Sequence, residues 1–176
     1  MAESSVDRQA IVAELERTRR TFRLLVESAG DDDFDRASAG TRWTNEQLLF
    51  HMVFGFMVVL RLVPLVRLFG RLPPAIGRAH ARLLNAATTP FHEINFRGSC
   101  AAALVFDRRR MVGKCDRVIA ALERKLAREP ERNLRLGMAF PSRWDPFFAD
   151  YMSLAEVYRY PVQHFDFHRR QLTLGE

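Results

Sequence analysis

The chain has 176 residues and a mass of 20.4 kDa, enough for one domain (1–176) that folds around its own core. With 48% hydrophobic and 27% charged residues, and only 9 Gly and 8 Pro, its composition excludes a disordered chain, a collagen-like repeat and a disulfide scaffold. The net charge of +6, from 27 Lys and Arg against 21 Asp and Glu, admits an anionic partner such as a nucleic acid or a membrane surface.

Two long helices are predicted in the first part of the chain. From Asp7 to Ser28, apolar residues recur at steps of three and four between charged ones, which is the period of an amphipathic helix. Thr44, with Gln47 three residues later, is a capping-box signature. A second helix should therefore begin there and run through an apolar stretch toward Pro64 or beyond. His51 falls on its second turn.

The middle of the chain is predicted to be a long irregular connection followed by a third helix. Gly and Pro interrupt residues 70–98, where we expect one short helix near Ile76 to Ala87. Helical periodicity resumes near Cys100 and continues to Glu129. In one continuous helix Cys100 and Cys115 would lie about 22 Å apart at a rise of 1.5 Å per residue, too far for a disulfide.

A fourth long helix is predicted near the end of the chain. Ser153 and Glu156 form a second capping-box signature, and the helix should reach about Leu172. Pro161 lies inside it and is expected to kink it. Four long helices without an alternating strand pattern predict an all-α fold, a four-helix bundle with a long irregular connection between helices 2 and 3.

Three histidines form the best candidate for a metal site. His164 and His168 are one turn apart on the same face of the predicted last helix, so both can bind one divalent cation at about 2.0–2.1 Å. His51, in an otherwise apolar helix, is the best candidate for a third ligand. Three neutral imidazoles leave an open coordination position, which is typical of reactive metal sites. On spacing alone, a surface pair or buried histidines with structural hydrogen bonds remain alternatives.

Trp43 shortly before the second helix, His51 on that helix, and a His164/His168 pair followed by Arg-Arg-Gln together resemble the DinB/YfiT-like family of four-helix metal-binding proteins. The resemblance implies a divalent metal, zinc or nickel, bound by His51, His164 and His168 at one mouth of the bundle. It also implies a low-molecular-weight thiol such as mycothiol, bacillithiol or glutathione. The metal would lower the pKa of that thiol, and the thiolate would attack a small electrophile.

Other residues are candidates for roles beside the metal. Tyr160, one turn before His164, is a candidate catalytic residue that would hydrogen-bond a ligand of the metal, although a buried Tyr with a backbone partner is the simpler interpretation. Arg143 and Trp144 are candidates for binding an anionic substrate or the carboxylates of the thiol; the alternative is a surface Arg stacked on Trp. Several Phe residues are most simply core residues, but some of them should line the wall around the histidines, and the resemblance then implies an apolar pocket that favours a hydrophobic or aromatic electrophile.

The leading hypothesis is a cytoplasmic metal-dependent S-transferase whose partners are a thiol and a small-molecule electrophile. The alternatives are a metal-dependent hydrolase that uses water bound by the metal, and a non-enzymatic metal-stabilised bundle that binds an apolar ligand. We expect no nucleic-acid partner, because the sequence has no recognition-helix pattern, zinc-finger spacing or aromatic–basic alternation. Residues 58–68 are a candidate homodimer face, although a fully buried helix explains them equally well.

We also expect no membrane partner and no secretory signal. The first twenty residues mix acidic and basic side chains and contain no apolar segment, which favours a cytoplasmic location. The most apolar stretch, residues 48–68, contains Arg61 and Arg67. Each Arg near the centre of a membrane-spanning helix costs about 2.5–3.5 kcal/mol on insertion scales, so a buried core helix is expected.

Overall fold

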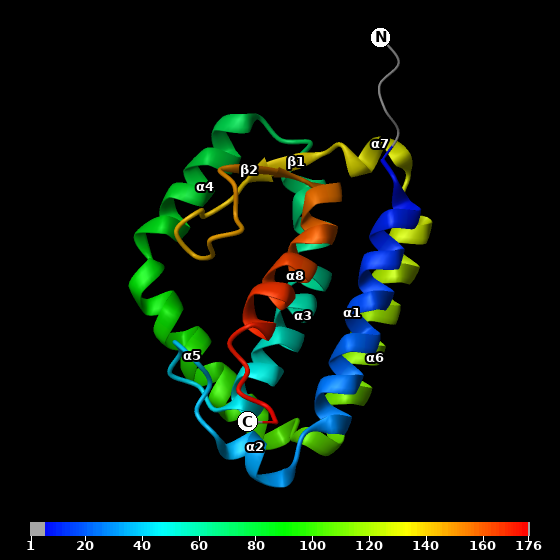
Figure 1. Cartoon of the computed structure of the whole chain (residues 1–176). Coiled ribbons are helices and arrows are strands. Elements are labelled where there is room, and N and C mark those ends of the chain that lie inside the picture. The colour runs from blue at the N-terminus through cyan, green and yellow to red at the C-terminus, as the bar shows by residue number, and fades with distance from the viewer. Residues whose placement is uncertain (1–5, 176) are drawn as a thin grey trace.

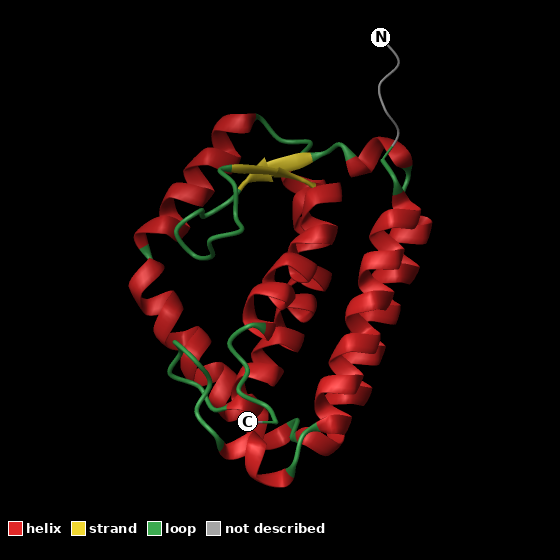
Figure 2. Cartoon of the chain, in the orientation of Figure 1, coloured by secondary structure: helices red, strands yellow, loops and turns green. Residues whose placement is uncertain are grey.

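The structure, a computed structural model, describes residues 6–175. These residues form eight helices and one two-stranded sheet (Figures 1 and 2). The predicted all-α bundle is confirmed. The helices are α1 (Arg8–Ser28), α2 (Asp31–Asp35), α3 (Asn45–Phe69), α4 (Pro74–Ala86), α5 (Thr88–Val105), α6 (Arg108–Arg128), α7 (Glu131–Leu134) and α8 (Leu154–Arg169). The short strands β1 (Gly137–Ala139) and β2 (Tyr151–Ser153), which no sequence pattern indicated, pair antiparallel.

The bundle is formed by α1, α3, α6 and α8. Figure 1 shows α1 beside α6, with α3 and α8 crossing the centre of the molecule, and α3 contacts both α6 and α8. Large apolar side chains with almost no exposed surface fill the space between these helices. They include Phe22, Leu49, Phe56, Ile119, Leu122 and Phe165. This core sets the positions of α3 and α8, the two helices that carry the candidate metal ligands.

Capping boxes fix the first turns of α3 and α8, as predicted. The Thr44 hydroxyl accepts a hydrogen bond from the Gln47 backbone N–H, and the Gln47 side chain accepts one from the Thr44 backbone N–H. Ser153 and Glu156 make the same reciprocal pair at the start of α8. Each pair satisfies two backbone donors that a helix start leaves unpaired, so the register of both helices is set locally. The α8 helix continues through Pro161 to Arg169.

The long connection after α3 is helical rather than irregular, which corrects the prediction for residues 70–98. Helix α4 begins at Pro74, where the missing N–H would have no intrahelical partner in any case. Pro90 lies in the first turn of α5 for the same reason, and Gly98 is an exposed position inside that helix. The Pro and Gly residues therefore occupy positions that a helix tolerates. Figure 1 shows α4 and α5 as an arm that bows outward on one side of the bundle and returns to it at the end of α5, which contacts α3.

The predicted third helix is in fact two helices. Helix α5 ends at Val105, and Asp107 begins α6 by accepting a hydrogen bond from the Arg109 backbone N–H. Cys100 and Cys115 consequently lie on different helices, so the distance expected for one continuous helix does not apply. Both cysteines are free thiols, as predicted.

Among the helices of residues 6–175, α3 alone has the length and the apolar composition that a membrane-spanning helix needs. Its most apolar window is 56% buried inside the protein. It also contacts α5, α6 and α8. A core helix of a soluble bundle has the same properties, so this feature is weak support for a membrane span.

Candidate metal centre

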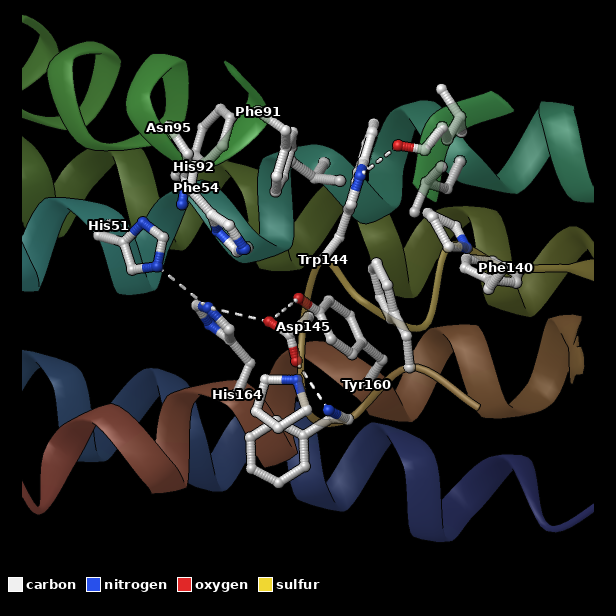
Figure 3. Close-up of a pocket in the computed structure, with 18 of the residues that line it drawn as sticks. His51, Phe54, Phe91, His92, Asn95, Phe140, Trp144, Asp145, Tyr160 and His164 are labelled. Carbon is white, nitrogen blue, oxygen red and sulfur yellow. Dashed lines mark hydrogen bonds and ion pairs between the residues drawn. The ribbon is translucent and has the colours of Figure 1, made fainter. Parts of the chain in front are cut away.

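His51 from α3 and His164 and His168 from α8 meet at one end of a cavity. One ring nitrogen from each histidine lies within 4.8 Å of the other two. The Nε2 atoms of His51 and His164 are 3.2 Å apart, and Figure 3 shows these two rings pointing toward each other. His51 and His164 are buried, and His168 is partly buried. The structure thus brings together all three predicted ligands.

The cluster fits a divalent metal in distance and in donor type. Two ligand atoms at about 2.0–2.1 Å from a tetrahedral metal lie about 3.3 Å from each other, close to the observed 3.2 Å between the two Nε2 atoms of His51 and His164. Imidazole nitrogen is a preferred ligand of zinc and nickel. These three residues could therefore hold such an ion.

Burial keeps the three imidazoles neutral, which is the form that binds a metal. Loss of hydration, with a smaller contribution from His168, lowers the pKa of His51 to about 3. Burial also lowers the pKa of His164 well below its ordinary value, and His51 and His168 add to this effect. The pKa of His168 is lowered for the same first reason. At neutral pH no proton competes with a cation for these nitrogens.

Hydrogen-bond partners orient two of the three rings. His168 Nδ1 lies 2.7 Å from Gln171 Oε1, which only accepts, so Nδ1 carries the proton and Nε2 keeps its lone pair. His51 Nδ1 lies 3.2 Å from the hydroxyl of Ser99, a buried residue of α5. Such partners fix the tautomer and direction of metal-binding histidines. The signal for Gln171 is its place after the histidine pair, whereas no sequence signal pointed to Ser99.

Two neighbours pack against the ligand rings. The ring of Trp43 stacks on His51 with 4.4 Å between centroids and an interplanar angle of 24°. Gly55, one turn after His51, leaves room for His164, because a Cβ at this glycine would lie 3.0 Å from His164 Nδ1. That Nδ1 has no hydrogen-bond partner among the described residues. The ring of His164 is therefore placed by packing rather than by a polar partner.

A cavity of about 310 Å³ opens beside the three histidines (Figure 3). Residues of α3, the α4–α5 arm, the loop after β1 and α8 line it. Most of its wall is apolar or aromatic, as in many small-molecule sites. The aromatic residues include Phe54, Phe91, Phe140, Trp144, Phe148 and Tyr160. His80 and His92 also line the cavity but lie outside the three-histidine cluster.

Of the other candidates, Tyr160 and Trp144 line the cavity and Arg143 does not. Tyr160 is buried, and its hydroxyl donates to Asp145 Oδ2 at 2.8 Å rather than to the backbone. Trp144 stacks on Phe91 at 3.8 Å between centroids, and its indole N–H donates to a backbone oxygen of α4. The side chain of Arg143 is exposed. The proposed roles of these residues stay predictions.

Asp145 is the residue of this site that sequence reasoning missed. Its Oδ2 lies 3.8 Å from His164 Nε2, and Figure 3 shows it between His164 and Tyr160. Its Oδ1 accepts a hydrogen bond from the Phe147 backbone N–H. An Asp before a Pro in an irregular segment signals only a turn, so the sequence offered no reason to place this carboxylate beside the histidines.

Comparison with known proteins identifies the family. A model of the DinB superfamily matches residues 14–172. No match was found among curated proteins or among solved structures. The matched region contains the four bundle helices almost completely and all three histidines of the cluster. The chain belongs to the DinB superfamily.

Proposed function

We propose that this protein is a metal-dependent enzyme that transfers a low-molecular-weight thiol to a small electrophile. His51, His164 and His168 would hold one divalent ion, zinc or nickel. The observation that carries this proposal is the convergence of three neutral imidazoles at the end of an apolar cavity. We place the activity in the cytoplasm, and we expect the thiol and the electrophile to be the partners. We expect no nucleic-acid or membrane partner. Residues 58–68 are a candidate homodimer face.

The chemistry divides between the ion and the chain. A divalent ion lowers the pKa of a thiol that it binds, which supplies a nucleophile at neutral pH. The chain's own residues orient the reactants: Ser99 and Gln171 direct two of the ligand rings, and the aromatic wall excludes water and holds an apolar electrophile beside the histidines. In the transfer, the S–H bond breaks and its proton passes to solvent, a carbon–sulfur bond forms, and the bond between that carbon and the leaving group breaks, the leaving group keeping the electron pair.

Metal-dependent hydrolysis is the second candidate, and the position of Asp145 favours it. A carboxylate next to an open metal site can accept a proton from an attacking water. Asp145 lies on the cavity side of His164 and is held there by the Tyr160 hydroxyl. The two reactions differ in their need for a thiol, so one kinetic comparison separates them.

The metal site is tested by elemental analysis of the purified protein and of histidine variants. We expect wild type to carry metal, and His51→Ala, His164→Ala and His168→Ala to have lost most of it. The matched control is His92→Ala, because His92 lines the same cavity outside the cluster. Equal metal content in all the variants would show that the site assignment is wrong.

The reaction is tested with one chromogenic aryl halide and a panel of thiols. We expect its consumption to depend on both metal and thiol, with a preference for one thiol. Equal rates with and without thiol would refute transfer and support hydrolysis. A metal-loaded protein that turns over no electrophile or ester in such a panel would support the non-enzymatic bundle instead.

A further inference from the structure

Among residues 6–175, the wall of the cavity contains one residue with a formal charge, Asp145, and that charge is negative. The chain has 27 Lys and Arg, yet none of those in residues 6–175 lines the cavity. Within the described part of the chain, Asp145 is the carboxylate that lines the wall. The sign of the charge inside the site is therefore opposite to the sign of the net charge of the protein.

Asp145 is a partly buried carboxylate in the cavity wall. Its side chain is 14% exposed, and its Oδ2 lies 3.8 Å from His164 Nε2. The groups that do contact its oxygens are donors, the Tyr160 hydroxyl at 2.8 Å and the Phe147 backbone N–H at 2.9 Å. Donors of this kind stabilise a carboxylate. They also fix its position toward the cavity and the histidines.

This charge limits what else can enter. Asp145 would repel an anionic group placed beside it, because like charges repel strongly in a site of low dielectric constant. We propose that the cavity takes an uncharged aromatic electrophile, that it rejects electrophiles carrying a carboxylate, sulfonate or phosphate, and that Asp145 sets this selectivity. The inference rests on the proposed function, because it names the substrate class of that same site.

The shape and chemistry of the wall support the aromatic part of the proposal. Trp144 and Phe91 are stacked with an interplanar angle of 9°, and Phe148 packs against Tyr160 with 4.6 Å between ring centroids. These rings offer a large apolar contact area to an aromatic ligand. A volume of about 310 Å³ lies at the lower end of the range of small-molecule sites, so one small ring system fits better than an extended ligand.

Intrinsic fluorescence gives a direct binding assay. The chain has 2 Trp, and both of them, Trp43 and Trp144, line the cavity. We would titrate the full chain, stripped of metal by a chelator and checked for helicity by circular dichroism, with 4-nitrobenzyl alcohol and with 4-nitrobenzoate. Both probes quench Trp fluorescence and share one ring, but only the second is an anion. We expect the alcohol to bind at least about tenfold more tightly, because like charges repel in a site of low dielectric constant.

Two aspartate variants test the cause of the preference. Asp145→Asn keeps the size of the side chain and removes its charge, and we expect it to reduce the preference to less than about threefold by strengthening the binding of 4-nitrobenzoate. Asp150→Asn is the matched control, because Asp150 is the exposed aspartate of the same loop and does not line this cavity. Equal affinity of wild type for the two probes, or an unchanged preference in Asp145→Asn, would overturn the proposal. If Asp145→Asn does not fold, the wild-type comparison still decides the selectivity, and Asp145→Ser replaces the variant.

A kinetic comparison separates this inference from the proposed function. The metal-loaded protein with thiol would be assayed with benzyl chloride and with 4-(chloromethyl)benzoate. We expect a higher kcat/KM for the uncharged electrophile, and a clear preference for the carboxylate would overturn the selectivity. If neither electrophile is consumed in a thiol-dependent way while the fluorescence preference persists, thiol transfer is wrong and the selectivity of the cavity stands.

Discussion

Gly55→Ala tests the metal centre with a single methyl group. An added Cβ would lie 3.0 Å from His164 Nδ1 and 3.4 Å from its Cε1, so the ring has to move by a few tenths of an ångström. It has little free space, because His51 lies 4.9 Å and His168 4.5 Å away between ring centroids. The displacement exceeds the tolerance of about 0.2 Å in metal–ligand distances.

We expect Gly55→Ala to weaken metal binding by roughly 10- to 100-fold, the size of effect seen when the support of a metal ligand is altered. The fold itself should be nearly unaffected. Replacing Gly by Ala inside a helix stabilises by about 1 kcal/mol, which offsets the cost of the tight contact. The melting temperature of the metal-free variant should therefore stay within about 2–4 °C of wild type.

Competition with a chromogenic chelator measures the affinity, and calorimetry of the metal-free protein measures the stability. Gly113→Ala is the matched control, because it also adds a methyl group to a long helix. Its Cβ would meet Arg117 Nη1 at 3.5 Å, an ordinary contact. Metal affinity in this control should equal that of wild type. Undiminished affinity in Gly55→Ala would refute the placement of His164 as a ligand packed against α3.

Three further predictions concern the support of the site and the stability of the bundle. Ser99→Ala removes the partner of His51 Nδ1 and should weaken metal binding by roughly tenfold in the same chelator assay; unchanged affinity would show that packing alone holds His51. Burial and the neighbouring Glu16 raise the pKa of Glu123 to about 7. Between about pH 4.5 and 7 the folded chain therefore holds more protons than the unfolded chain. The free energy of unfolding falls as the pH rises through this window. Glu123→Gln should therefore raise the melting temperature at pH 8 by a few degrees and leave it nearly unchanged at pH 4; an equal shift at both pH values would contradict this account. Thr44→Ala removes the N-terminal cap of α3 and should cost about 1 kcal/mol in urea unfolding, whereas Thr44→Ser should recover most of this loss.

Local sequence signals predicted the parts of the site that lie within one helix. The spacing of His164 and His168 and the capping boxes at Thr44 and Ser153 depend only on neighbours in the chain. The structure contains both capping boxes and places the two histidines side by side. Including His51 required an argument about the bundle interior and the resemblance to a family. A contact between distant parts of the chain can be predicted in this way when the helix concerned is apolar along most of its length, as α3 is.

The parts that were missed depend on how distant segments pack. Ser99 reaches His51 only because α5 continues the helical arm, a segment that Pro and Gly content made appear irregular. Asp145 lies beside His164 because its loop is anchored to α4 through the Trp144 indole. Neither residue has a characteristic spacing relative to a histidine. Hydrogen bonds between elements so far apart in the chain cannot be read from periodicity.

The net charge of +6 is a sequence property that suggested a feature the cavity lacks. Composition pointed to an anionic partner, but arginines in the described chain pair acidic groups on neighbouring helices, as Arg17 does with Asp166 of α8 and Arg23 with Asp116 of α6. Pairs exposed in this way contribute at most about 1 kcal/mol each, and they lie outside the cavity wall. The ligand meets the charge of the wall rather than the charge of the whole chain, because solvent screens surface charges within about 10 Å. Selectivity in this protein should therefore respond to Asp145 and hardly at all to the removal of surface arginines.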